Sequence, residues 1–216
     1  MPFRMLNSKI AEAQVLPGQT MYSQRGSMLA YTGQVSFTPD IQGGQGGLTS
    51  MIGRRVANEA TPLMTVEGSG TVMFGHGGHE VHVIEMAGDT LYVEADRLLA
   101  FDGSLQQGTM FMGSQGGVMG MVRGQVTGQG LFTTTLAGHG AAAVMAHGGV
   151  LELPITPQRP VHVDPQAYVA HRGQVQNKLS TALGWRDMVG RGSGEAFQLE
   201  LSGNGTVYVQ ASEEKL

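Results

Sequence analysis

The sequence lacks cysteine and has few charged side chains, and both shortages exclude functions. Without cysteine there can be no disulfides, thiol nucleophiles or thiolate metal sites. Charged residues make up only 14% of the chain, the net charge is −4, and no basic cluster is longer than the pair Arg54 and Arg55. We therefore expect no nucleic-acid partner, because such a partner needs a basic surface.

Long apolar runs are also missing. No stretch approaches the roughly 18 apolar residues that cross a membrane, so no transmembrane segment is expected. The opening residues, MPFRMLNSKIAEAQ, contain neither the apolar stretch of a secretory signal nor an arginine-rich transit sequence. These features predict a cytoplasmic protein.

Glycine is abundant, with 34 copies among 216 residues. Most glycines stand singly or in pairs between runs such as TVMF, EVHVIEM, LFTTTL and TVYVQA. Runs of this kind, bounded by glycine, are typical of short strands joined by tight turns. The pattern predicts an all-β protein.

One motif occurs three times at equal spacing, at residues 21–35, 91–105 and 161–175. Three alanines and three glycines fall in register: Ala30, Ala100 and Ala170, and Gly33, Gly103 and Gly173. We expect the alanines to be closely packed, since a larger side chain would overfill a core. The glycines are expected to adopt a positive φ in a turn.

The motif divides the chain into three repeats. Their predicted bounds are about 1–86, 87–157 and 158–211, within one compact domain covering residues 1–216. A G-x-G sequence also recurs late in each repeat, at residues 68–70, 138–140 and 203–205. Its position between two strand-like runs predicts a hairpin turn.

The runs PGQTMYSQRGSMLAYTGQV, DTLYVEADRLLAFDGSL and GQGLFTTTLAGHGAAAV resemble the altered inheritance of mitochondria protein 24 family. The resemblance covers roughly residues 3–211. It implies three tandem β-sandwich-like modules with pseudo-threefold symmetry, similar to the fold of the tryptophan RNA-binding attenuation protein. It implies no enzymatic activity, cofactor or catalytic residue. Mitochondrial members are linked to inner-membrane organisation, and this chain resembles a bacterial, cytoplasmic member with a role in stress response.

The densest set of candidate ligands is the hairpin-like run His76, His79, Glu80 and His82. Imidazoles and a carboxylate are ligands for Zn²⁺, Ni²⁺ or Cu²⁺. The alternative is a structural turn, because His147 is followed by two glycines in the same way as His76, in the matching part of the second repeat. A metal site at His76, His79 and His82 therefore stays one of two interpretations.

Catalytic signatures are missing from the sequence. No G-x-S-x-G nucleophile elbow and no G-x-G-x-x-G dinucleotide fingerprint in a strand–helix context are present. The leading hypothesis is a non-enzymatic binding or scaffolding protein that engages a protein partner or associates with itself. The alternatives are metal binding by the histidines and small-ligand binding near the pseudo-threefold axis.

Overall fold

The computed structural model describes residues 2–40, 63–112, 131–181 and 197–213, and this part of the chain is all-β. Thirteen strands and one short 3₁₀ helix, η1 (Ala95–Arg97), make up the described fold. The strands are β1 (Phe3–Asn7), β2 (Ile10–Val15), β3 (Met21–Gln24), β4 (Met28–Pro39), β5 (Leu63–Phe74), β6 (Glu80–Glu94), β7 (Leu98–Asp102), β8 (Gln106–Met112), β9 (Leu131–Ala146), β10 (Val150–Ile155), β11 (Val161–Val163), β12 (Tyr168–Thr181) and β13 (Phe197–Gln210).

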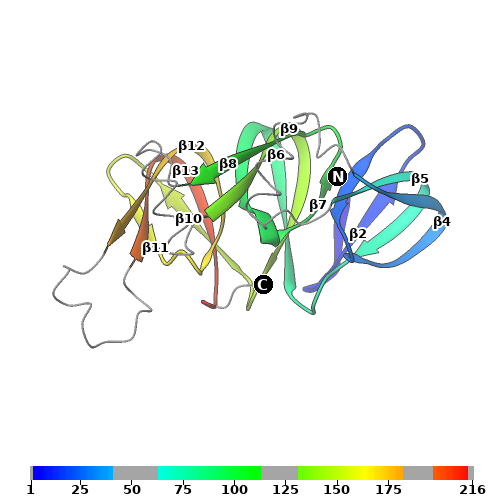
Figure 1. The fold of residues 1–216 in the computed structure, drawn as a ribbon, viewed down its shortest axis with the longest axis horizontal. Coiled ribbons are helices and arrows are strands. Elements are labelled where there is room, and N and C mark those ends of the chain that lie inside the picture. The colour runs from blue at the N-terminus through cyan, green and yellow to red at the C-terminus, as the bar shows by residue number, and fades with distance from the viewer. Residues whose placement is uncertain (1, 41–62, 113–130, 182–196, 214–216) are drawn as a thin grey trace.

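All these strands belong to one antiparallel hydrogen-bonded network. Its main path is β1-β2-β5-β3-β7-β9-β6-β12-β13-β10, and β4 pairs with β5, β8 with β9 and β11 with β13. The molecule is elongated, with β4 and β5 at one end of its long axis and β11 at the other (Figure 1).

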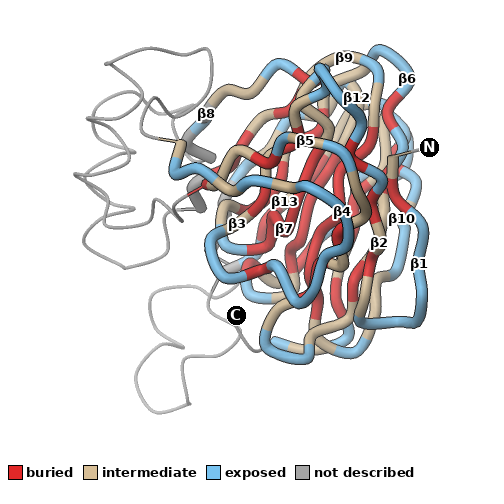
Figure 2. The backbone as a smooth tube through the Cα atoms, turned by 90° about the vertical axis from the view of Figure 1, so that its right-hand side faces the viewer, coloured by how far each residue is buried: buried red, intermediate tan, exposed pale blue. Residues whose placement is uncertain are grey.

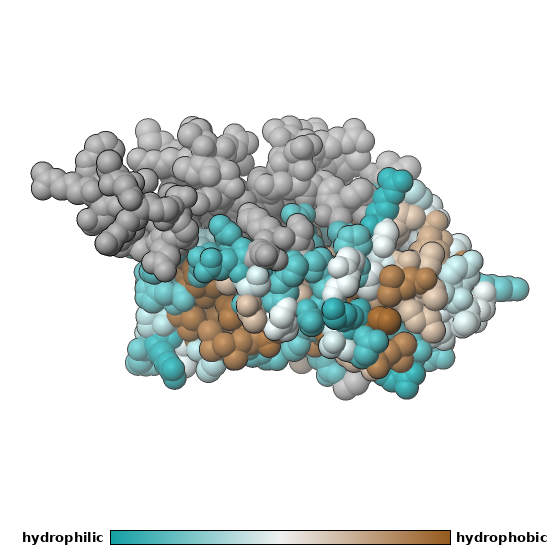
Figure 3. Space-filling model, turned by 90° about the horizontal axis from the view of Figure 1, so that it is seen from below, coloured by the Kyte–Doolittle hydropathy of each residue, from teal (hydrophilic) through white to brown (hydrophobic). Residues whose placement is uncertain are grey.

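Alternation of apolar and polar residues explains why the strands bury one face. In β2, Ala11, Ala13 and Val15 are buried, while Glu12 and Gln14 between them reach the surface. This is the two-residue period of a pleated strand. Figure 2 shows the resulting core, with buried segments enclosed by exposed outer strands. Apolar residues also reach the surface in two separate areas of the face shown in Figure 3.

The G-x-G sequences lie inside strands, so the prediction of hairpin turns is wrong. Gly68 and Gly70 are in the middle of β5, where Gly70 is opposite Gly33 of β4. A Cβ atom at Gly70 would lie 2.0 Å from the carbonyl oxygen of Thr32. Glycine is required here because two backbones approach closely, which is a recurrent use of glycine within strands.

Two interstrand contacts join distant parts of the chain. In the first, β3 pairs with β7, and Tyr22 is opposite Phe101. In the second, the end of β6 pairs with β12, and Tyr92 is opposite His171. Tyr92 and His171 each lie 70 residues after their counterparts Tyr22 and Phe101, so the two contacts have the same register.

The aligned alanines occupy different environments. Ala100 and Ala170 are fully buried, and each lies within one of the two interstrand contacts. Ala30 is exposed, because β4 pairs only with β5 among the described strands. The expected close packing therefore does not hold for Ala30.

The aligned glycines also differ. Gly33 and Gly173 have the expected positive φ values, 83° and 94°, but they lie inside β4 and β12 and not in turns. Gly103 is not among the glycines with positive φ. Its nitrogen donates to the carbonyl oxygen of Thr20, and a Cβ atom there would lie 2.3 Å from that oxygen. Close backbone approach, and not a left-handed turn, is what requires glycine at position 103.

Candidate functional site

A buried aromatic and imidazole cluster lies where β6 meets β12. The His171 ring stacks on Tyr92, with centroids 4.6 Å apart and planes 6° from parallel. The Tyr168 hydroxyl lies 2.7 Å from Nδ1 of His171 and 3.1 Å from the carbonyl oxygen of Tyr92. When the hydroxyl donates to that carbonyl, Nδ1–H of His171 donates to the hydroxyl oxygen.

Burial controls the charge of this cluster. It lowers the pKa of His171 to about 4, because the charged imidazolium is poorly solvated there. Burial also raises the pKa of Tyr168 well above its ordinary value. Both groups are therefore neutral near pH 7, and the cluster has the character of a packed strand contact.

A second buried polar group is Arg97 in η1. Its Nε donates to Oε2 of Glu94 over 2.7 Å, and its guanidinium also donates to the carbonyl oxygen of Gln166 and to Oε1 of Gln210. The arginine is only 1% exposed. Its partners come from β6, β13 and the residues before β12, so Arg97 fastens distant elements together. A cation enclosed to this extent is not accessible to a ligand.

The histidines predicted as metal ligands have separate partners. His76 Nδ1 lies 3.4 Å from the carbonyl oxygen of Gly26, and His82 Nε2 lies 3.3 Å from Oε1 of Glu152. His79 instead meets His147, with ring centroids 4.3 Å apart and nearly perpendicular planes. Within the described ranges, no group of three or more His, Cys, Asp or Glu residues could hold a metal ion.

The contact between His79 and His147 was not predicted from sequence. Burial, followed by the charge of the neighbouring His147, lowers the pKa of His79. The adjacent Glu80 accepts a hydrogen bond from the backbone nitrogen of Gly148, and this bond is the main reason that its pKa is lowered. Pairing of Glu80 with Ala146 brings the two histidine–glycine turns together. The duplicated His-Gly-Gly sequence was the signal for this arrangement.

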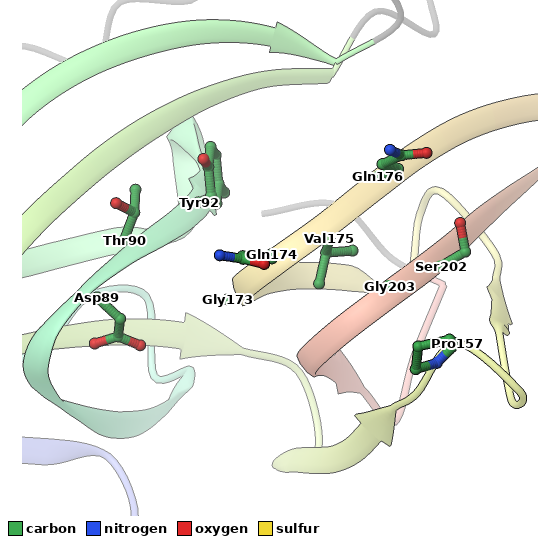
Figure 4. A pocket seen from close by; sticks show the side chains of 10 residues that line it. All are labelled: Asp89, Thr90, Tyr92, Pro157, Gly173, Gln174, Val175, Gln176, Ser202 and Gly203. Atoms are coloured by element: carbon green, nitrogen blue, oxygen red, sulfur yellow. The ribbon is translucent and has the colours of Figure 1, made fainter.

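A shallow hollow lies between the bend of β6 and the β12–β13 pair (Figure 4). The Asp89 carboxylate at its edge is held by Nε of Arg172 over 2.8 Å. The other lining residues are uncharged, so the hollow suits a neutral polar molecule better than an ion. Its lining residues are Asp89, Thr90, Tyr92, Pro157, Gly173, Gln174, Val175, Gln176, Ser202 and Gly203.

Among the described strands, the segment with the most exposed large apolar side chains is residues 28–31 of β4, which we call the β4 edge. Met28, Leu29 and Tyr31 are 39%, 53% and 47% exposed. At the matching positions of the second motif copy, Leu98, Leu99 and Phe101 are 3%, 0% and 0% exposed. They belong to the core clusters, and their strand β7 has β3 as a second neighbour. Figure 2, seen from the β4 end, shows this strand as an exposed outer rim.

The β4 edge could not be recognised from sequence, because residues 28–31 match residues 98–101 in apolar character. Only the strand pairing shows that one copy has a second neighbouring strand and that the other, within the described fold, does not.

The methionine-rich run beginning at Met110 gives a weaker candidate for a contact surface. Met110 is 42% exposed, whereas Met119 and Met121 lie outside the described residues.

The family profile described as Mitochondrial biogenesis AIM24 matches residues 3–212 of this chain. No curated protein sequence matches it. Among solved structures, the chain is similar to an X-ray crystal structure of a Streptococcus pyogenes protein, a structural genomics target. The two share 20% sequence identity with a TM-score of 0.72, over 97% of this chain and 92% of the other. At that identity the similarity shows the fold.

In the described part of the chain, no helix has the length and apolar character needed to cross a membrane.

Proposed function

The chain belongs to the mitochondrial biogenesis AIM24 family, and we propose that it is a non-enzymatic scaffolding protein that acts through protein–protein contacts. The observation that carries this proposal is the β4 edge. Its apolar side chains are exposed and no described strand pairs with its outer side, whereas the matching residues 98–101 are buried. Exposed strand edges of this kind bind extended partners by adding a strand to the sheet.

The scaffold that we propose consists of three repeats in one domain, with bounds near 1–86, 87–157 and 158–211. The recurrence of the β3–β7 contact in the β6–β12 contact, one repeat later, supports this division. Similarity to the fold of the tryptophan RNA-binding attenuation protein and a pseudo-threefold relation between the repeats belong to the same proposal. So do a cytoplasmic location and a stress-related role, which imaging of the tagged protein under stress would test.

The arrangement of polar groups supports a non-enzymatic role. Among the described residues, the most buried polar groups include Arg97, His171 and Tyr168, and all three are hydrogen-bonded inside strand contacts. None of the three lines the hollow shown in Figure 4. Turnover by purified protein that depended on a single polar residue would contradict the proposal.

Affinity capture from the native host tests the role of the β4 edge. The baits are the wild type, Leu29→Asp and Leu151→Asp. Leu151 is a matched control, because it is 57% exposed but lies on β10. We expect specific partners to be lost with Leu29→Asp and retained with Leu151→Asp. Identical partners for all three baits would show that the β4 edge is not the binding surface.

Metal binding by His76, His79 and His82 is the alternative from the sequence, and it gains no support from the described residues, because the three histidines contact different partners. Elemental analysis of untagged protein, with His79→Ala as the control variant, tests it directly. Absence of bound metal after purification in metal-containing buffer would rule out metal binding.

Binding of a small neutral ligand in the hollow is tested by thermal-shift screening, because a ligand of the native state raises apparent stability.

A further inference from the structure

We propose that β11 of one copy of this chain pairs with the β4 edge of a second copy, continuing the sheet head to tail. This inference rests on the proposed scaffolding function and names the partner, which is the chain itself. The partner strand is residues 161–163, which we call the β11 edge. In the third repeat it occupies the place that residues 21–23 and 91–93 occupy in the first and second.

The two contacts inside the chain supply the template. In the first, Tyr22 lies opposite Phe101, and Ser23 lies opposite Ala100. In the second, the equivalent positions are paired one repeat later: Tyr92 lies opposite His171, and Val93 lies opposite Ala170. In both cases the first strand of one motif copy pairs with the second strand of the next copy.

The same rule predicts a third contact. The β11 edge is the third strand of this kind, and its partner would be the second strand of another motif copy. The β4 edge is the second strand of the first motif copy, and among the described strands the first strand of no other copy pairs with it. In the repeated register His162 would lie opposite Tyr31, Val163 opposite Ala30 and Val161 opposite Thr32.

Side-chain contacts support this register. Tyr22 and Phe101 are stacked, with ring centroids 5.1 Å apart and planes 21° from parallel. Tyr92 and His171 are stacked in the same way, with 4.6 Å between centroids. His162 and Tyr31 occupy the corresponding positions, and both are exposed. The third pair would therefore stack a histidine on a tyrosine, as the second pair already does.

Both edges are available in the described structure. Among the described strands, β4 pairs only with β5, and β11 pairs only with β13. The counterparts of the exposed Met28, Leu29 and Tyr31 are buried in both other copies of the motif. Among the described strands, the β4 edge therefore lacks a first-strand neighbour, and the β11 edge is a first strand. The β11 edge lacks a second-strand neighbour, and the β4 edge is a second strand.

A second copy, and not the same chain, is the occupant. The β4 edge and β11 lie at opposite ends of the elongated molecule (Figure 1). Pairing between two different surfaces is heterologous, so it generates a closed ring or an open filament, depending on the rotation per copy. The repeated register pairs Tyr31 with His162, which lies on a different strand, so it does not describe a symmetric β4–β4 dimer.

Engineered disulfides test the register cleanly, because the chain contains no cysteine of its own. Full-length Tyr31→Cys and His162→Cys variants are mixed under mild oxidation and analysed by non-reducing electrophoresis and mass spectrometry. We expect a cross-linked dimer that contains one copy of each. Tyr31→Cys mixed with Leu151→Cys is the control and should remain largely uncross-linked.

Sedimentation of the wild type over a concentration series completes the test. We expect mass to increase with concentration, and Leu29→Asp to weaken association by at least about tenfold, since a buried leucine contributes that much. Circular dichroism checks that the variants are folded. Cross-linking of Tyr31→Cys with itself, or within one chain carrying both cysteines, would overturn the head-to-tail pairing.

The outcomes separate this inference from the proposed function. A wild type that stays monomeric at all concentrations and shows no mixed cross-link would overturn self-pairing. If Leu29→Asp still lost a specific partner in the capture experiment, the scaffolding function would stand without it. If neither result appeared, both proposals would fail.

Discussion

Residues 28–31 and 98–101 have almost the same apolar character and opposite environments. Leu99 is fully buried in a core cluster with residues of β2, β5 and β9, whereas Leu29 is 53% exposed on a strand with one neighbour among the described strands. The difference shows that a repeated sequence motif fixes what a strand can bind but not whether a partner strand is present. In the first repeat we expect that partner to come from outside the chain.

The largest expected effect comes from truncating the two leucines. Leu99→Ala should lower the free energy of unfolding by about 2–5 kcal/mol, because it leaves a cavity in a closed core. Leu29→Ala should change it by no more than about 0.5 kcal/mol, as for most exposed sites. Urea unfolding at a concentration where the protein is monomeric measures both. Equal losses would mean that the β4 edge is covered within a single chain.

The second prediction concerns His171, the counterpart of Phe101. Its pKa is 6.5 when unfolded and about 4 when folded, so between these values the unfolded chain binds more protons. The contribution of His171 to the free energy of unfolding should therefore be fully present above pH 6.5 and should decrease as the pH falls towards 4. The loss over this window is about 3 kcal/mol.

Urea unfolding between pH 7.5 and 4.5 measures this effect. His171→Phe reproduces the residue found at position 101 and should remove the His171 contribution to the slope. His139→Phe is the control, because His139 is exposed. A slope that His171→Phe left unchanged would show that the imidazole titrates freely in the folded protein.

A smaller effect is expected for Gly103→Ala. The added methyl group would lie 2.3 Å from the backbone oxygen of Thr20, so β3 and β7 would have to move apart. Strain of this kind costs about 1–3 kcal/mol. The same measurement of unfolding applies, and hydrogen exchange should increase along β3 and β7. Unchanged exchange in these strands would show that the contact tolerates the shift.

The all-β class was predictable, because glycine-bounded apolar runs leave little choice of secondary structure. The equal spacing of the three motif copies was also visible, and both internal contacts follow it. The G-x-G sequences were placed in turns incorrectly, since sequence alone does not distinguish a turn glycine from one where two backbones meet. Gly70 opposite Gly33 is the second kind.

The candidate site was less predictable than the fold. His76, His79 and His82 are close in sequence, but in the structure they contact Gly26, His147 and Glu152, respectively. Only His82 lies in a strand, β6, whereas His76 and His79 flank the turn before it, so proximity in sequence does not produce a cluster. The β4 edge was missed because its residues look like core, and its exposure depends on a neighbour that the described part of the chain does not provide.

The smallest expected effect tests the predicted stacking of His162 on Tyr31. An aromatic pair adds about 0.5–1.5 kcal/mol beyond burial, so His162→Ala should weaken association by roughly 2- to 10-fold. The stability of the monomer should not change, because His162 is exposed. Sedimentation at pH 7.5 compares the wild type, His162→Ala and His139→Ala, the last of which should associate like the wild type. Equal association by all three proteins would rule out the repeated register, because that register requires contact between the rings of His162 and Tyr31.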